Sequence, residues 1–168
     1  FDGDGTIWYP RKTKRKIKPN WIYNDVKIGK DFLKHLTLTP LTLQTLKKLR
    51  KLGFYLVLLS TFPHSKKEAD ILLQEKAKYL GIKSLFDEIH TSRDYPKGKG
   101  EIIIKILKKK HIIKSHAILI GDSYRYDYMS AKKVGVDALL INSEYVKKVP
   151  KLKKRLIKEH LLENKCLE

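Results

Sequence analysis

FDGDGTIW, residues 1–8, opens the chain and fits two kinds of site. Its alternating aspartates could belong to a calcium-binding loop, or they could end a β-strand that presents one aspartate as a nucleophile and another as an acid. A calcium loop requires a bidentate glutamate at its twelfth position, which here is Arg11, and Pro10 stands where its exiting helix should begin. The calcium interpretation therefore fails, and phosphoryl transfer becomes the hypothesis to follow along the chain.

The length and composition of the chain predict one globular domain over residues 1–168. Hydrophobic residues make up 42% of the sequence, which is typical of a folded protein. No apolar run reaches membrane-spanning length, and the single Cys166 cannot form an internal disulfide, so we expect a cytoplasmic protein. His64, His111 and His116 show no ligand spacing with a cysteine, which argues against a zinc site.

The chain is strongly basic, with 37 Lys and Arg residues against 18 Asp and Glu residues and a formal net charge of +19. Such an excess is compatible with a nucleic-acid partner. The lysines are nevertheless spread between apolar residues at helical spacing, which favours solvated helix faces. A denser basic run at residues 11–18 follows the first motif, and we expect it to lie in a short flap near residues 7–30.

Apolar runs of strand length alternate with helical patterns along the chain. The continuous run Phe54–Leu59 is typical of a strand that helices cover on both faces. This alternation predicts an α/β fold, a Rossmann-like three-layer sandwich with a parallel sheet, and it leaves room only for a short flap as a minimal cap. The expected strands are the stub at Phe1 and residues 54–59, 86–90, 117–120 and 138–141. The expected helices are residues 41–52, 66–80, 101–110, part of 123–135, and a C-terminal helix near 150–164.

Polar side chains follow several of the predicted strands, at the edge where α/β sheets bind ligands. Carboxylates gathered at such an edge repel one another unless a divalent cation lies between them. Oxygen ligands with open positions favour Mg²⁺, which retains water and accepts phosphate as a ligand. The residues expected at this edge are Asp2, Asp4, Ser60, Thr61, Asp122, Ser123 and Asp127, together with Lys97 or Lys99 at the start of a helix.

Four motifs resemble those of the haloacid dehalogenase superfamily, in order and in position. DGDGT at residues 2–6 is similar to the superfamily's Asp-x-Asp-Gly-Thr, and LVLLS ends in a strand-end hydroxyl at Ser60. Lys99 matches the motif lysine, and GDSYRYD at residues 121–127 matches Gly-Asp-x-x-x-x-Asp. Two further matches resemble the small magnesium-dependent phosphatase branch: Asp-x-Asp-x-Thr-x-Trp ends here at Trp8, and Tyr-Pro-x-x-Lys appears as YPKGK. The resemblance implies four or five apolar residues before the nucleophile, where this sequence shows only Phe1.

The resemblance implies a catalytic role for several of these residues. Asp2 is the expected nucleophile, which forms an aspartyl-phosphate, and Asp4 is the expected general acid and then general base. Ser60 and Lys99 are expected to stabilise charge on the phosphoryl group. The Tyr-Pro-x-x-Lys spacing favours Lys99 over Lys97.

The resemblance also implies a metal site and its surroundings. The expected Mg²⁺ ligands are the Asp2 carboxylate, the Asp4 backbone carbonyl and Asp122, while Asp127 orients a water bound to the metal. The residues expected beside the phosphate or behind these ligands are Gly3, Thr61, Ser123 and Asp127.

Together these features predict a Mg²⁺-dependent phosphomonoester hydrolase that acts on a phosphorylated small molecule or a phosphoprotein. Asp4 favours phosphomonoester hydrolysis, because dehalogenases and transport ATPases of the superfamily lack an aspartate at that position. Two alternatives remain open: a basic nucleic-acid-binding module on a degenerate phosphatase scaffold, and a nucleic-acid end phosphatase. No membrane partner is expected.

Overall fold

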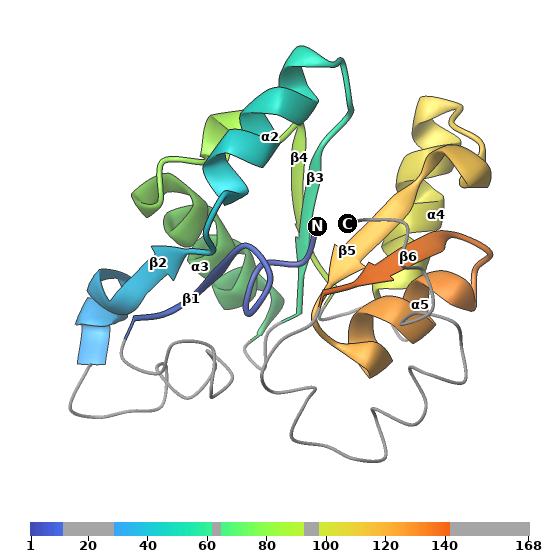
Figure 1. Ribbon diagram of the computed structural model, residues 1–168. Helices are drawn as coiled ribbons and strands as arrows, with labels where there is room; N and C mark the ends of the chain where they lie inside the picture. Colours follow the sequence, from blue (N-terminus) through green and yellow to red (C-terminus); the bar gives the residue numbers. More distant parts are fainter. Residues whose placement is uncertain (12–28, 62–64, 93–97, 142–168) are drawn as a thin grey trace.

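A computed structural model describes residues 1–11, 29–61, 65–92 and 98–141, and it confirms the α/β fold (Figure 1). Two parallel strand pairs form its centre, β3 with β4 and β5 with β6, and β1 pairs with β2 in an antiparallel hairpin. The strands are β1 (Trp8–Pro10), β2 (Leu36–Leu38), β3 (Val57–Ser60), β4 (Glu88–Thr91), β5 (Ile118–Gly121) and β6 (Asp137–Leu140). The α-helices are α2 (Thr42–Lys51), α3 (Lys66–Tyr79), α4 (Lys99–Lys110) and α5 (Met129–Lys132).

The first two residues lie between the two parallel pairs and join them. The Phe1 amino group donates to the Val57 carbonyl at 2.7 Å, and the Phe1 carbonyl accepts from the Leu59 N–H at 2.8 Å. On the other side, the Asp2 N–H donates to the Ile120 carbonyl at 2.8 Å. The spatial order is therefore β4, β3, residues 1–2, β5 and β6, with the N-terminus between β3 and β5 (Figure 1). The predicted stub occupies the centre of the sheet.

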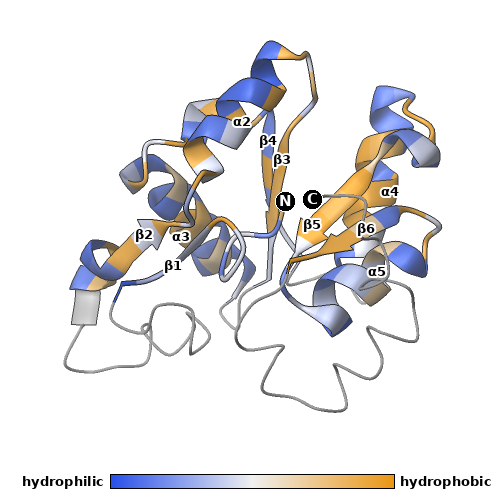
Figure 2. Cartoon of the chain, viewed as in Figure 1, coloured by the Kyte–Doolittle hydropathy of each residue, from blue (hydrophilic) through white to orange (hydrophobic). Residues whose placement is uncertain are grey.

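Helices cover β3 on both faces. Leu58 is buried in one apolar cluster with Leu46 of α2 and Leu73 of α3, whereas Leu59 packs in another cluster with Ile102 of α4. Because successive side chains of a strand point to opposite faces, α2 and α3 lie on one side of β3 and α4 lies on the other. Figure 2 shows hydrophobic residues along β3 and β5 and hydrophilic residues over much of α2. This arrangement is the predicted three-layer sandwich.

Local sequence signals explain where the helices begin. The Ser65 hydroxyl accepts from the Glu68 N–H at 3.4 Å, and the Glu68 carboxylate accepts from the Ser65 N–H at 3.1 Å, so a capping box starts α3 as its sequence predicts. Helix α4 begins at Lys99 and not at residue 101, because Gly98 adopts a positive φ of 65° at its N-cap. The helical stretch expected before Gly135 is shorter, since a π-helical turn at Tyr124–Tyr128 precedes α5.

The antiparallel hairpin follows the first motif directly. Trp8 of β1 lies opposite Leu38 of β2 and is fully buried in the core beside α2 and α3. Directly after β1, the Arg11 Nε donates to the Leu36 carbonyl of β2 at 3.3 Å. The flap expected near residues 7–30 stays a prediction: its first part overlaps β1, and residues 12–28 lie outside the described part of the chain.

Some expectations concern residues that lie outside the described ranges. These are the C-terminal helix near 150–164, Cys166, His64 and Lys97. The single domain over residues 1–168 stays a prediction. Over residues 1–11, 29–61, 65–92 and 98–141, no helix is both long and apolar enough to cross a membrane.

Candidate active site

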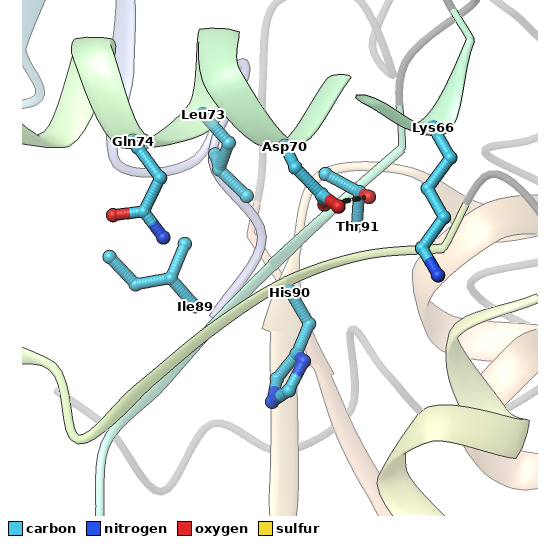
Figure 3. Close-up of a pocket in the computed structure, with 7 residues that line it drawn as sticks. All are labelled: Lys66, Asp70, Leu73, Gln74, Ile89, His90 and Thr91. Atoms are coloured by element: carbon cyan, nitrogen blue, oxygen red, sulfur yellow. Dashed lines mark hydrogen bonds between the residues drawn. The ribbon is translucent and has the colours of Figure 1, made fainter. Parts of the chain in front are cut away.

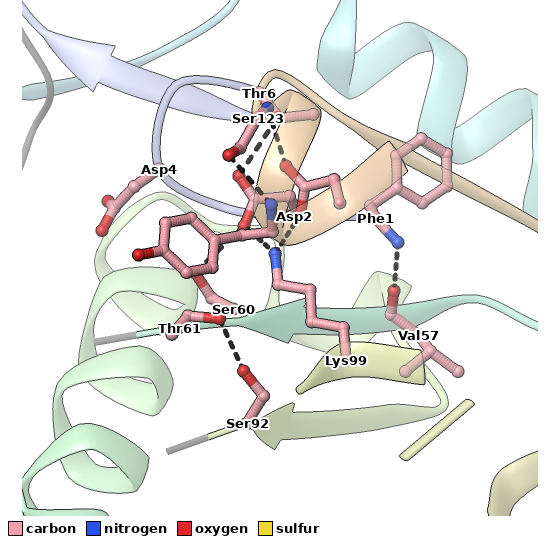
Figure 4. A network of polar contacts seen from close by, with 12 residues as sticks. Phe1, Asp2, Asp4, Thr6, Val57, Ser60, Thr61, Ser92, Lys99 and Ser123 are labelled. Carbon is pink, nitrogen blue, oxygen red and sulfur yellow. Dashed lines mark hydrogen bonds and ion pairs between the residues drawn. The ribbon is translucent and has the colours of Figure 1, made fainter. Parts of the chain in front are cut away.

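Several of the predicted site residues lie at the carboxyl edge of the parallel sheet. Asp2 follows the central stub, Ser60 ends β3, and Asp122 follows β5 directly. All three side chains are buried, although charged groups rarely are unless they are paired. Figure 4 shows this network of polar contacts, in which Lys99 reaches Asp2 from the N-terminal end of α4.

Lys99 is the central cation of the cluster. Its Nζ lies 2.5 Å from Asp2 Oδ1 and 2.5 Å from Asp127 Oδ1, and only 2% of its side chain is exposed. Burial alone lowers the pKa of Lys99, but the adjacent Asp127 and Asp2 carboxylates outweigh burial and raise that pKa above its ordinary value. Lys99 is therefore a fixed positive charge in the site at neutral pH.

Among the residues that the structure describes, three carboxylates share this pocket with the Lys99 ammonium. One carboxylate oxygen from each of Asp2, Asp122 and Asp127 lies within 4.8 Å of the others. Burial raises the pKa of Asp127, and Lys99 opposes that shift. Three buried carboxylates against one ammonium leave an excess of negative charge, and their oxygen-only donor set suits a hard divalent cation such as Mg²⁺. The residues present therefore fit the metal that the motifs imply.

The Asp127 carboxylate contacts the protein through both of its oxygens. Asp127 Oδ1 pairs with Lys99, and Asp127 Oδ2 accepts from the Ser123 N–H at 2.9 Å. A Cβ on Gly121 would overlap the Asp127 carboxylate, which explains the glycine of this motif. Both oxygens of Asp127 are therefore engaged by the protein, and its expected role in orienting a metal-bound water stays a prediction.

The turn after Asp2 holds the carboxylate of that residue in place. The Thr6 hydroxyl donates to Asp2 Oδ2 at 3.2 Å, and the Ser60 hydroxyl donates to Asp2 Oδ1 at 3.3 Å. The Gly3 carbonyl accepts the N–H of residue 7 at 2.9 Å, which closes the turn. Gly5 has a φ of 90°, and a Cβ there would meet the carboxylate of Asp122. Thr6 was not among the predicted site residues, although its place in the DGDGT motif was a signal for it.

Asp4 lies apart from this network and is held from the side of α3. Lys76 Nζ lies 2.8 Å and 3.0 Å from the two carboxylate oxygens of Asp4, and Trp8 Nε1 also donates to one of them. Figure 4 shows the Asp4 carboxylate pointing away from Asp2. Burial lowers the pKa of Lys76 to about 8, and the charge of Asp4 acts in the opposite direction. Nothing in the sequence around Lys76 distinguishes it from the surface lysines of the same helix.

The rim of the site carries two further hydroxyl groups. Thr61 Oγ1 and Ser92 Oγ lie 2.5 Å apart, which ties the end of β3 to the end of β4. Beside this rim, α3 and β4 enclose a cavity of about 360 Å³ (Figure 3), and the Thr91 hydroxyl there donates to Asp70 at 2.5 Å. The lining residues are Lys66, Asp70, Leu73, Gln74, Ile89, His90 and Thr91.

The fold and the site define a class of protein: Rossmann-like α/β proteins with a carboxylate and lysine cluster at the carboxyl edge of a parallel sheet. A family model described as haloacid dehalogenase-like hydrolase matches residues 1–141 of the chain. The chain belongs to this family. The resemblance drawn from the four sequence motifs is thereby confirmed.

Similar proteins include one curated enzyme and several solved structures. The glyceraldehyde 3-phosphate phosphatase of Methanothermobacter thermautotrophicus is 29% identical over 107 residues, which cover 62% of this chain and 45% of that enzyme. The match thus spans less than half of the length of this relative. The HAD phosphatase of Thermococcus onnurineus has a TM-score of 0.58 and 22% identity, covering 84% of each chain. A protein of Clostridium difficile has a TM-score of 0.62 and 19% identity over 96% of each chain, and at these identities the two structures show the fold alone.

Proposed function

We propose that the chain is a Mg²⁺-dependent phosphomonoester hydrolase in which Asp2 is the nucleophile. One observation carries this proposal: the Asp2 carboxylate is buried at the carboxyl edge of the sheet, with Lys99 and Ser60 on one oxygen and Thr6 on the other. A carboxylate fixed in this way loses little orientational freedom when it attacks phosphorus. The family match and the phosphatase name of the curated relative support the same reaction.

Each residue has one task in the proposed reaction. A carboxylate oxygen of Asp2 attacks phosphorus, the bond from phosphorus to the ester oxygen breaks, and the protonated form of Asp4 gives its proton to that leaving oxygen and becomes a carboxylate. Asp4 then takes a proton from water as the water attacks the aspartyl-phosphate, which releases phosphate and restores Asp2. Lys99 and Ser60 stabilise the charge that builds on the phosphoryl oxygens.

The proposed metal site consists of the Asp2 carboxylate, the Asp4 backbone carbonyl and Asp122. When bound there, Mg²⁺ would neutralise negative charge on the phosphate and would give the buried carboxylates a counter-charge. Asp127 would orient a water next to the metal, since Lys99 and Ser123 already hold its own oxygens.

A phosphorylated small molecule is the proposed substrate class. The curated relative is named for glyceraldehyde 3-phosphate, a small phosphate ester. The direct test is phosphate release from p-nitrophenyl phosphate and from glycerol phosphate by the full chain, with Mg²⁺ or with EDTA. We expect release from both esters in Mg²⁺ and none in EDTA. Activity that is indifferent to EDTA would remove the metal from the proposal, and no release from either ester at any pH would overturn the proposal itself.

Asparagine replacements at the two motif aspartates test the metal assignment. We expect Asp122→Asn to raise the Mg²⁺ concentration for half-maximal activity by more than about 100-fold, because a proposed ligand loses its charge. Asp127→Asn should raise it only about 10-fold, because outer partners of a metal site contribute less. Calorimetric Mg²⁺ titration gives the same comparison without turnover. If the two variants raise the required Mg²⁺ concentration equally, the assignment of Asp122 as ligand and Asp127 as orienting residue is wrong.

A further inference from the structure

A buried lysine that the proposed reaction does not use contacts the proposed acid. Lys76 lies on the inward face of α3, next to the buried residues Leu73 and Ala77, and its side chain has 0% exposure. Its ammonium group nevertheless reaches across to the first motif, where it contacts both carboxylate oxygens of Asp4 at 2.8 Å and 3.0 Å. The two residues are 72 positions apart in the sequence.

A second donor fixes the Asp4 carboxylate from the same region of the core. Trp8 Nε1 donates to Asp4 Oδ1, and the Lys76 ammonium lies 5.6 Å from the centroid of the Trp8 ring. Trp8 is fully buried, so neither donor can move without disturbing the core. The Asp4 side chain is 14% exposed, and both groups that hold its carboxylate are fully buried in the core.

The energetic cost of this arrangement distinguishes a positioning role from a merely structural tie. Burying an ammonium group is costly before its partner compensates, and replacing a whole buried ion pair with apolar residues of similar volume is often neutral or stabilising. A helix that needed only to pack against Trp8 would be served by methionine at position 76. The positive charge of Lys76 is needed for something else, and its contacts point to the orientation of the Asp4 carboxylate.

An in-line reaction constrains where the acid lies relative to the nucleophile. In such a displacement the leaving oxygen lies on the far side of phosphorus from the nucleophile, so the acid must be aimed at a point away from Asp2. Figure 4 shows Asp4 set apart from Asp2 and its carboxylate pointing away from it. We propose, building on the proposed function, that Lys76 is a positioning residue that, with Trp8, holds the Asp4 carboxylate for proton transfer at the leaving oxygen of the ester.

The test compares two esters that differ in how much they need an acid. The alkoxide of glycerol phosphate leaves only with a proton, whereas p-nitrophenolate leaves without much help. Because kcat/KM reports the steps up to the first release of product, it isolates the transfer to Asp2. We expect Lys76→Met to lower kcat/KM for glycerol phosphate by about 10–100-fold, a part of the ~10²–10⁴-fold that a positioned acid supplies. For p-nitrophenyl phosphate, kcat/KM should change less than about 3-fold, since that ester hardly uses the acid.

Two further variants keep the comparison decisive. Lys78→Met, at an exposed position of the same helix, should leave both esters unaffected. In an Asp4→Asn background, adding Lys76→Met should cause no additional loss, because Lys76 acts through Asp4. Circular dichroism and thermal unfolding report whether each variant is folded, and the background experiment compares only variants that fold.

The outcomes separate this inference from the proposed function. A wild-type chain that hydrolyses neither ester in Mg²⁺ overturns the function and the inference together. Suppose instead that the wild-type chain hydrolyses both esters. If kcat/KM of a folded Lys76→Met variant then falls equally for the two esters, or falls for neither, the inference alone is overturned. If Lys76→Met does not fold, an additional loss caused by Lys76→Gln in the Asp4→Asn background overturns it, and the absence of such a loss supports it.

Discussion

Replacing Asp2 with asparagine is expected to lower kcat for phosphate ester hydrolysis by at least ~10³-fold, because an amide cannot form the phospho-enzyme. The fold should persist, since asparagine has the same volume and Lys99 keeps its ion pair with Asp127. Steady-state phosphate release measures the first effect, and thermal unfolding measures the second.

Asp4→Asn is the matched control for this variant. It should also reduce turnover, but it leaves the nucleophile in place, so a good leaving group such as p-nitrophenolate can still be released once per site. We therefore expect a stoichiometric burst of p-nitrophenol from Asp4→Asn and no burst from Asp2→Asn. Near-wild-type turnover in Asp2→Asn would move the nucleophile to another residue.

Lys99→Met is expected to damage both activity and stability. The Lys99 ammonium lies 2.5 Å from both Asp2 and Asp127, and its removal leaves buried carboxylates without their cation. Breaking a buried pair in this way costs about 3–5 kcal/mol in the free energy of unfolding. Loss of its charge from the phosphoryl site should lower kcat/KM by more than about 100-fold. Urea unfolding without Mg²⁺ and phosphate release with Mg²⁺ measure the two effects.

Lys97→Met is the control for this change, because it lies two residues away in the same YPKGK motif. We expect Lys97→Met to change the free energy of unfolding by less than about 0.5 kcal/mol and kcat/KM by less than about 2-fold, because Lys99 supplies the ion pairs with Asp2 and Asp127. The opposite pattern, with Lys97→Met the damaging variant, would shift the motif lysine by two residues.

Much of the fold could be predicted because a buried parallel sheet imposes a simple pattern. The run ending in Leu59 is continuously apolar, since β3 has helices on both faces. Ser65 and Glu68 form the capping-box pattern that predicts the start of α3. The hairpin was missed because strands of three residues, such as Trp8–Pro10, are too short for an alternating pattern to show.

The site could be predicted only where its residues follow strands. Asp2, Ser60 and Asp122 come together because the carboxyl ends of parallel strands meet at one edge. Lys76 comes from the inner face of a helix, and its neighbours in the sequence are those of an ordinary amphipathic segment. Its contact with Asp4 depends on how α3 packs against Trp8, and that packing is a long-range property without a local signal.

The most direct measurement of the central claim is chemical trapping of the phospho-enzyme. The full chain is mixed with p-nitrophenyl phosphate and Mg²⁺, quenched in acid and treated with borohydride, which reduces an acyl phosphate to the corresponding alcohol. We predict that mass spectrometry finds homoserine in place of aspartate at position 2, more abundantly in Asp4→Asn than in wild type and never in Asp2→Asn. Homoserine at another position, or turnover with an unmodified Asp2 in both chains, would contradict the assignment of Asp2 as the nucleophile.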